Sequence, residues 1–270
     1  PRPQASANQG ETGETENSGE APGQISGDRK DDFWTFLLVG QDTFGGGNTD
    51  TMMLVSYDIP NQKLSVLSLP RDTMVNVSWD IKRLNSVYNY APYYDKEGME
   101  FLKEEIAQLV GYEPDFTVTI QWDAVGELVD AIGGVYFEVP FDMYYNDLSQ
   151  NFKIDLKAGY QKLDGDQAMQ LIRYRHNSIG DTGRIDSSYG YANGDLGRIE
   201  TQQAFLKAVI QQCLQLKNVT KINALAKVFT ENVETELTIG NLAWFAQQAI
   251  FGGLQMENVN FCTMPNQGEM

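Results

Sequence analysis

The sequence contains very few of the histidines and cysteines on which imidazole or thiolate metal sites, disulfides and His- or Cys-dependent catalysis rely. It has one histidine, His176, and two cysteines, Cys213 and Cys262. Two cysteines form neither a metal-type pair nor a disulfide framework. No Ser-His-Asp or Cys-His arrangement can be assembled without His176. Because a single histidine is more often a surface or packing residue than a catalyst, we do not assign it as a base.

Positive charge is also scarce. The 270 residues include 20 Lys and Arg against 37 Asp and Glu, a formal net charge of -17. Binding to nucleic acid, or to an anionic membrane surface through a polybasic patch, needs a basic face on the protein. The acidic composition argues against both functions. No apolar run approaches the roughly 18 residues that cross a bilayer. An anionic ligand would have to be held locally, against the field of the whole protein.

The remaining composition suits a folded domain behind a tether. Residues 1–31 have almost no large apolar side chains, which is typical of a disordered linker. Hydrophobic residues make up 41% of the sequence and aromatic residues 11%, which is enough for a core. We therefore expect a linker over 1–31 and one catalytic domain over 32–270.

Alternating strand and helix patterns predict a three-layer α-β-α domain with a central mixed sheet. Gly98 to Val110 has a helical apolar stripe, and Asp164 with Gln167 can form a capping box for a following helix. A long helix is expected to begin near Arg198. Strands are predicted over 33–39, 51–57, 63–69, 116–120, 135–139 and 259–263, and a further helix over 124–132.

All arginines of the expected domain lie in short segments that also carry Gly, Asp or Asn. Guanidinium groups bind phosphate bidentately and stay charged, so this placement favours a phosphorylated ligand. The alternative is that each arginine pairs with a neighbouring Asp at the surface. The six residues are Arg71, Arg83, Arg173, Arg175, Arg184 and Arg198.

Arg173 and Arg175 follow the helix that Asp164 caps. If this segment is extended, both side chains point to one side and can clamp a diphosphate, with Tyr174 and His176 on the other side. If it is helical, the two arginines diverge by about 200° and the clamp fails.

Arg198 at a helix start conflicts with the positive partial charge there, and a bound anion would relieve the conflict. Asp195 as the N-cap could supply the same relief, and Gln202 lies one turn later on the same face. A near copy of this motif, Gly180 to Asp186, contains Arg184. The motifs alone therefore do not decide whether Arg184 or Arg198 binds the ligand.

Asp42 and Asp50 flank the glycine-rich loop between the first two expected strands, where they could hold Mg²⁺; the alternative is that both are ordinary turn residues. Arg71 follows Pro70, which holds it on a stiff stem, and Asp72 could orient it or form a strand-end salt bridge with it.

Together these segments resemble the LytR-CpsA-Psr family of Gram-positive cell-wall enzymes. The resemblance runs collinearly from about Phe33 to Leu216, and its combination of motifs is far more specific than any one of them. The segments are 37–42 (LLVGQD), 49–55 (TDTMMLV), 67–73 (LSLPRDT), 82–85 (KRLN), 129–135 (VDAIGGV), 163–168 (LDGDQA), 173–176 (RYRH) and 194–203 (GDLGRIETQQ).

The resemblance implies a transferase that moves a glycopolymer, of teichoic acid or capsular polysaccharide type, from a polyprenyl pyrophosphate carrier to peptidoglycan. It implies location at the extracellular face of the cell membrane, through an anchor outside this sequence, and a lipid tunnel between sheet and helices. It assigns Mg²⁺ to Asp42 and Asp50, catalysis to Asp50, Arg71 and Arg198, and the pyrophosphate to Arg71, Arg173, Arg175 and Arg198 with Asp195 and Gln202 in support.

Two departures from the family pattern remove positive charge. The family commonly has arginine where Asn48 and Thr201 stand. We take Arg198 as the family arginine, because only its copy of the motif runs into Gln202 and Gln203, and we expect Arg83 to be structural. Two other functions remain open: a polyprenyl diphosphate pyrophosphatase, and a non-catalytic polyprenyl-phosphate carrier or sensor.

Overall fold

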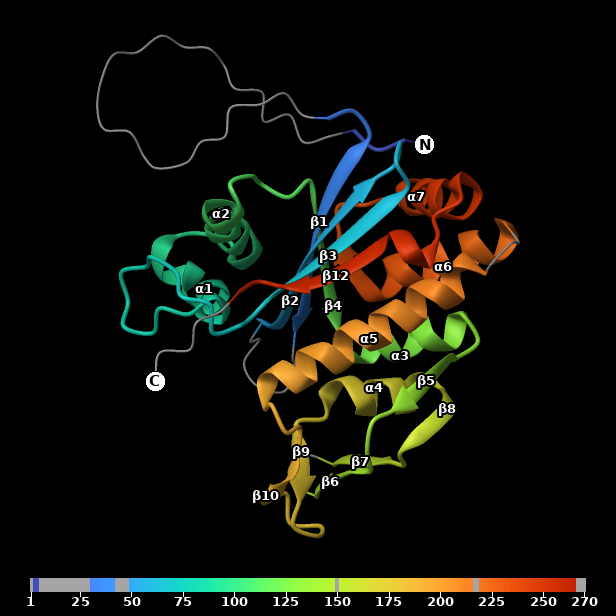
Figure 1. Cartoon of the computed structure of the whole chain (residues 1–270). Coiled ribbons are helices and arrows are strands. Elements are labelled where there is room, and N and C mark those ends of the chain that lie inside the picture. Colours follow the sequence, from blue (N-terminus) through green and yellow to red (C-terminus); the bar gives the residue numbers. More distant parts are fainter. Residues whose placement is uncertain (1, 5–29, 42–48, 149–150, 216–218, 266–270) are drawn as a thin grey trace.

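A central sheet of six strands organises the molecule, in the order β11-β4-β1-β2-β3-β12 (Figure 1). The computed structural model describes residues 2–4, 30–41, 49–148, 151–215 and 219–265. β2 is antiparallel to β1 and β3, whereas β4 runs parallel to β1 and β12 parallel to β3. The predicted mixed sheet is thus confirmed. Its strands are β1 Phe33–Gln41, β2 Thr49–Asp58, β3 Lys63–Leu69, β4 Phe116–Gln121, β11 Val233–Thr235 and β12 Val259–Thr263.

Both faces of the sheet are buried, which explains the nearly continuous apolar sequence of β1. Leu37 and Val39 belong to one core cluster, together with residues of helices α1 (Leu84–Tyr90) and α2 (Gly98–Val110). Trp34 and Phe36, on the alternate positions of the strand, contact Phe245 of helix α7 (Ile239–Gly252). Side chains two residues apart share a face of a strand. The sheet is therefore the middle of three layers.

Helices cover the two faces unequally (Figure 1). α1 (Leu84–Tyr90) and α2 (Gly98–Val110) lie on one side, and α2 has the predicted bounds. The short α1 and the 3-10 helices Ala91–Tyr94 and Met256–Asn258 were not predicted. The helices on the other side are α3 Trp122–Ala131, α5 Asp195–Leu214, α6 Val219–Asn232 and α7 Ile239–Gly252.

Three short ribbons and α4 (Gly165–Arg173) form a lobe beside α5 (Figure 1). Asp164 caps α4 through the predicted capping box, accepting from Gln167 N at 2.9 Å and donating its own N–H to Gln167 Oε1 at 3.1 Å. The ribbons pair β5 Val135–Val139 with β8 Gly159–Leu163, β6 Met143–Asp147 with β7 Phe152–Leu156, and β9 His176–Ser178 with β10 Ile185–Gly190.

The expected linker, 1–31, lies mostly outside the described residues. Of its few described residues, Arg2 forms an ion pair with Asp32, with Arg2 Nη2 2.7 Å from Asp32 Oδ1. Within the part of the chain that the structure describes, none of the helices is both long enough and apolar enough to span a bilayer.

Candidate functional site

The end of α4 places two of the predicted arginines in one pocket. α4 stops at Arg173, and Tyr174 turns extended, with φ -62° and ψ 134°. Tyr174 is fully buried, so it anchors the turn while Arg173 and Arg175 line a pocket of about 220 Å³. The Cζ atom of Arg173 lies 4.0 Å from the ring centroid of Phe152. We call this cavity the arginine pocket.

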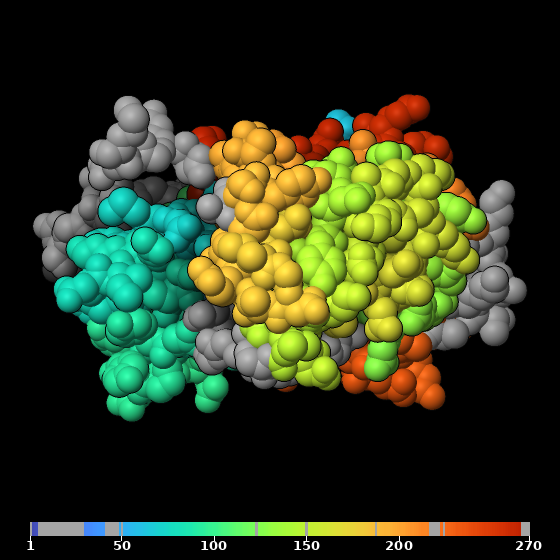
Figure 2. Space-filling view, turned by 90° about the horizontal axis from the view of Figure 1, so that it is seen from below, coloured from blue at the N-terminus to red at the C-terminus, as the bar shows by residue number. Residues whose placement is uncertain are grey.

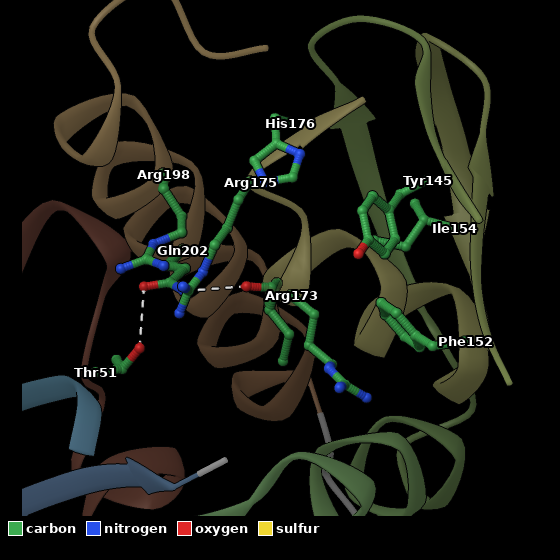
Figure 3. Close-up of a pocket in the computed structure, with 10 residues that line it drawn as sticks. Thr51, Tyr145, Phe152, Ile154, Arg173, Arg175, His176, Arg198 and Gln202 are labelled. Atoms are coloured by element: carbon green, nitrogen blue, oxygen red, sulfur yellow. Dashed lines mark hydrogen bonds between the residues drawn. The ribbon is translucent and has the colours of Figure 1, made fainter. Parts of the chain in front are cut away.

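Within the arginine pocket the two guanidinium groups diverge (Figure 3). Arg175 points toward Gln202, whereas Arg173 points to the opposite end, toward Phe152. The two arginines therefore contribute to one pocket from its two ends, which differs from the narrow clamp expected for an extended segment. His176 also lines the pocket, although an extended segment would place it on the other side.

α5 supplies the third arginine of the pocket. Arg198 is 4% exposed, and its Nη2 atom lies 2.6 Å from Asp195 Oδ1. Gly194, with φ 57°, is the N-cap, so Asp195 is the first residue of the helix and does not cap it with its side chain. An acidic residue in the first turn balances the positive end of the helix dipole. Asp195 thereby holds a buried guanidinium at the pocket wall.

Gln202 and Gln203 connect α5 to the rest of the site. Gln202 is buried and donates from Nε2 to the carbonyl of Ile172 at 3.1 Å, and its Oε1 accepts from Thr51 Oγ1 at 3.4 Å (Figure 3). Gln203 Nε2 lies 2.7 Å from Ser68 Oγ and 3.0 Å from Thr263 Oγ1. The pair therefore ties the helix to α4 and to the end of the sheet.

Arg71 lines a small adjoining recess instead of the arginine pocket itself. Asp195 and Gln202 line the same recess. The Nε atom of Arg71 lies 3.7 Å from Asp72 Oδ2, and Arg83 Nη1 lies 2.9 Å from the other oxygen of that carboxylate. Gln202 belongs to both cavities, so Arg71 faces the same region from the β3 side.

An apolar cavity of about 320 Å³ adjoins the arginine pocket. Thr51, Ile172 and Gln202 line both spaces. The cavity lies between the sheet and helices α3, α5 and α6, where its lining includes Met53 and Val209. A cationic pocket thus borders an apolar cavity, which suits a ligand with an anionic head and an apolar tail.

The apolar cavity borders a second chamber of about 170 Å³ beside α7. Cys213, Leu225 and Phe229 line both spaces. Burial raises the pKa of the Cys213 thiol from 9.0 to about 11, as expected for a thiol in apolar surroundings.

The predicted metal ligands are less fully described. Asp42 and Asn48 lie outside the described residues, and for Asp50 the structure describes the backbone alone. The register pairs Gly40 with Thr51 and Gln41 with Thr49, so β2 bulges at Asp50. Bulges often occur beside functional sites. The described residues contain no group of three or more His, Cys, Asp or Glu side chains placed to hold a metal ion.

The two copies of the Gly-Asp-x-Gly-Arg motif adopt different structures. The second copy opens α5, whereas the first forms the turn between β9 and β10, with Gly180 at φ 55° and Gly183 at φ 66°. Arg184 is exposed there and does not line the arginine pocket. Thr201, where the resemblance led us to expect arginine, donates its hydroxyl to Gly197 O at 3.0 Å within α5.

Seen from below relative to Figure 1, the β9–β10 segment lies between two lobes (Figure 2). Residues around 70–95 flank it on one side and the ribbons of residues 135–165 on the other. Thr51, Tyr145 and Phe152 also line the pocket; Thr51 lies in the 49–55 motif, whereas no sequence motif identified Tyr145 or Phe152. The sequence signal that could have placed His176 in the pocket is its position directly after Arg175.

A family model and the curated relatives that match this chain indicate the same family. The LytR_cpsA_psr family model matches residues 3–270. The polyisoprenyl-teichoic acid–peptidoglycan teichoic acid transferase TagV of Bacillus subtilis (strain 168) is 28% identical over 215 residues, 79% of this chain and 51% of TagV. Regulatory protein MsrR of Staphylococcus aureus (strain COL) is 25% identical over 236 residues, 86% of this chain and 64% of MsrR. The chain thus spans between half and two thirds of the length of these relatives.

Solved structures share the fold. The crystal structure of B. subtilis TagV has a TM-score of 0.69 and 23% identity, covering 88% of this chain and 87% of that one. The structure of TagT bound to LI-WTA has a TM-score of 0.61 and 19% identity, covering 86% of this chain and 79% of that one.

Proposed function

The chain belongs to the LytR-CpsA-Psr family, and we propose that it transfers a glycopolymer from a polyprenyl pyrophosphate carrier to peptidoglycan. The similarity to a teichoic acid transferase supports a polymer of teichoic acid type ahead of capsular polysaccharide. We further propose that the domain works at the outer face of the cell membrane, where both the lipid-linked donor and peptidoglycan are accessible.

One observation carries the proposal: the arginine pocket and the apolar cavity meet at Thr51, Ile172 and Gln202. Phosphate is recognised by guanidinium groups, and a polyprenyl chain by an apolar channel. A polyprenyl pyrophosphate has these two parts joined in one molecule. Three arginines line this one pocket, and a bound diphosphate would offset the repulsion between their like charges.

The proposed reaction is a phosphoryl transfer. An acceptor hydroxyl attacks the phosphorus that carries the polymer, the new P–O bond forms, and polyprenyl phosphate leaves. Arg198 and Arg175 hold the diphosphate oxygens, and Arg71 approaches them from the adjoining recess, so developing negative charge is stabilised by fixed cations. Asp195 keeps Arg198 in place.

We propose Asp42 and Asp50 as the ligands of Mg²⁺, since a bulge next to the pocket and carboxylate chemistry suit a hard cation. Bound there, Mg²⁺ would neutralise charge on the phosphates. The proposal for the arginines does not depend on the metal.

A reconstituted reaction tests the function. Purified protein, a polyprenyl pyrophosphate-linked polymer and peptidoglycan fragments should yield peptidoglycan that carries the polymer, and Arg198→Ala should abolish the product. Free polymer phosphate without attachment would instead indicate a pyrophosphatase. Tight lipid binding that survives chelation of Mg²⁺, with no turnover, would indicate a carrier or sensor.

A further inference from the structure

His176 stands out among the side chains of the arginine pocket. The described residues that line the pocket include no carboxylate, and the others are arginines, a glutamine, and hydroxyl, aromatic and aliphatic side chains. Imidazole is the side chain most often used as a general base. The transfer reaction needs a base, because the acceptor hydroxyl must lose its proton as it attacks phosphorus.

The hydrogen bonding of His176 determines which ring nitrogen is available. Nδ1 lies 3.2 Å from the backbone carbonyl of Asn177. A carbonyl oxygen only accepts, so Nδ1 carries the hydrogen and donates it. In the neutral ring Nε2 then has a free lone pair, which is the tautomer that a base requires.

The ring is held in a fixed orientation at the pocket edge. It packs edge-on against Tyr145, with the ring centroids 5.6 Å apart and an interplanar angle of 67°. The backbone of His176 pairs with that of Gly190 on β10. The two strands lie close together there, since a Cβ atom added to Gly190 would come within 3.4 Å of the His176 Cα. Figure 3 shows the imidazole beside Arg175, across the pocket from Phe152.

We propose that His176 is the general base of the transfer reaction, with Nε2 accepting the proton of the acceptor hydroxyl. This inference rests on the proposed function. As the acceptor oxygen bonds to phosphorus, its proton moves to Nε2 and the P–O bond to polyprenyl phosphate breaks. The imidazolium keeps its Nδ1–H bond to Asn177 and later releases the Nε2 proton to solvent, which the half-buried ring can reach.

Several charged or titratable groups surround His176, and they would be unchanged in a variant of this residue alone. Tyr145 faces the ring from β6, and its own hydroxyl lies 3.4 Å from Asp147 Oδ2. Three arginines line the same pocket: Arg173 at the end of α4, Arg175 directly before β9, and Arg198 on α5. On β10, Asp186 pairs in register with Asn177, next to His176.

One substitution, His176→Asn, separates a chemical role of this residue from a structural one. In His176→Asn the amide Nδ2 can take the place of Nδ1 and keep the bond to the Asn177 carbonyl, but no basic atom remains. We expect kcat of transfer to fall about 100-fold or more, with affinity for the lipid pyrophosphate little changed. The acidic limb of the wild-type kcat profile against pH should disappear. Added imidazole should restore part of the activity of His176→Ala.

Two controls make the outcomes distinct. Arg184→Ala, on the neighbouring turn, should transfer as the wild type does, and thermal unfolding of each variant reports on the fold. A wild-type kcat in His176→Asn, or a loss of lipid binding in parallel with turnover, would overturn the assignment. If the wild type itself transfers no polymer, the proposed function fails, and His176 is then not at issue.

Discussion

The guanidinium of Arg198 lies 2.6 Å from the carboxylate of Asp195, one turn earlier on α5, and the arginine side chain is 5% exposed. This pair fixes the direction of a buried cation at the wall of the arginine pocket. A charged group buried in this way is stable because its partner stays with it, and a phosphate oxygen can approach the other side of the guanidinium.

Arg198→Ala should weaken binding of polyprenyl pyrophosphate by about 10- to 100-fold, since a charge-assisted hydrogen bond contributes ~1.5–3 kcal/mol. Calorimetric titration of the lipid in detergent measures the change. Arg184→Ala is the matched control from the first copy of the motif, and it should bind normally. Equal weakening in both variants would mean that the lipid does not use the arginine pocket selectively.

Gln203→Ala should destabilise the fold more than it affects chemistry. Its amide holds α5 to Ser68, to Thr263 and to the carbonyl of Cys262 at 3.1 Å. Loss of these bonds should lower the free energy of unfolding by ~1–3 kcal/mol. Urea unfolding checks this, with the exposed Gln211→Ala on the same helix as control. An unchanged midpoint would show that the hydrogen bonds of the Gln203 amide contribute nothing to stability.

Val209→Trp should block the apolar cavity, because Val209 lines it from α5. The larger ring would fill the space needed by the polyprenyl chain, at a cost in stability of about 1–3 kcal/mol. Lipid binding should be lost while short water-soluble pyrophosphates still bind. The exposed Ala204→Trp on the same helix should bind lipid normally. Full lipid binding by the Val209 variant would place the chain elsewhere.

The Cys213 thiol predicts a pH dependence of stability. Its pKa rises from 9.0 to about 11 on burial, so the unfolded chain loses this proton first as pH rises. The stability that the buried neutral thiol contributes is complete below about pH 9, and it is lost as the pH rises from about 9 to about 11. Urea unfolding across the interval should therefore show a shallower loss of stability in Cys213→Ala than in the wild type. Parallel curves would contradict the buried neutral thiol.

The sequence predicts regular elements best where the signal is local. The stripe over Gly98–Val110 and the final strand Val259–Thr263 match the structure in their bounds, and so does the capping box of Asp164. α1 was missed because it is a short helix without a side-chain cap, and the three-residue β11 because its pairing with β4 joins distant segments. Such elements depend on tertiary contacts more than on propensity.

For the candidate site as well, the sequence predicts what depends on local signals and misses what depends on tertiary contacts. Arginines beside Gly and Asp could be picked out as a set, but their convergence depends on where α4 stops and where α5 starts. The sequence leaves the conformation after Arg173 open, because it depends on the burial of one C-cap residue, Tyr174. Thr51, Tyr145 and Phe152 reach the pocket from three other strands, so only the assembled sheet and ribbons bring them together.

The most direct test of the central claim follows the phosphate itself. A donor is prepared with a radiolabel in the phosphate attached to the polymer, and the protein is incubated with it and peptidoglycan. We predict that the label enters the peptidoglycan fraction in a phosphodiester, with one polyprenyl phosphate released for each label transferred. Label that stays on the lipid, or appears only as soluble polymer phosphate, would contradict the proposed transfer.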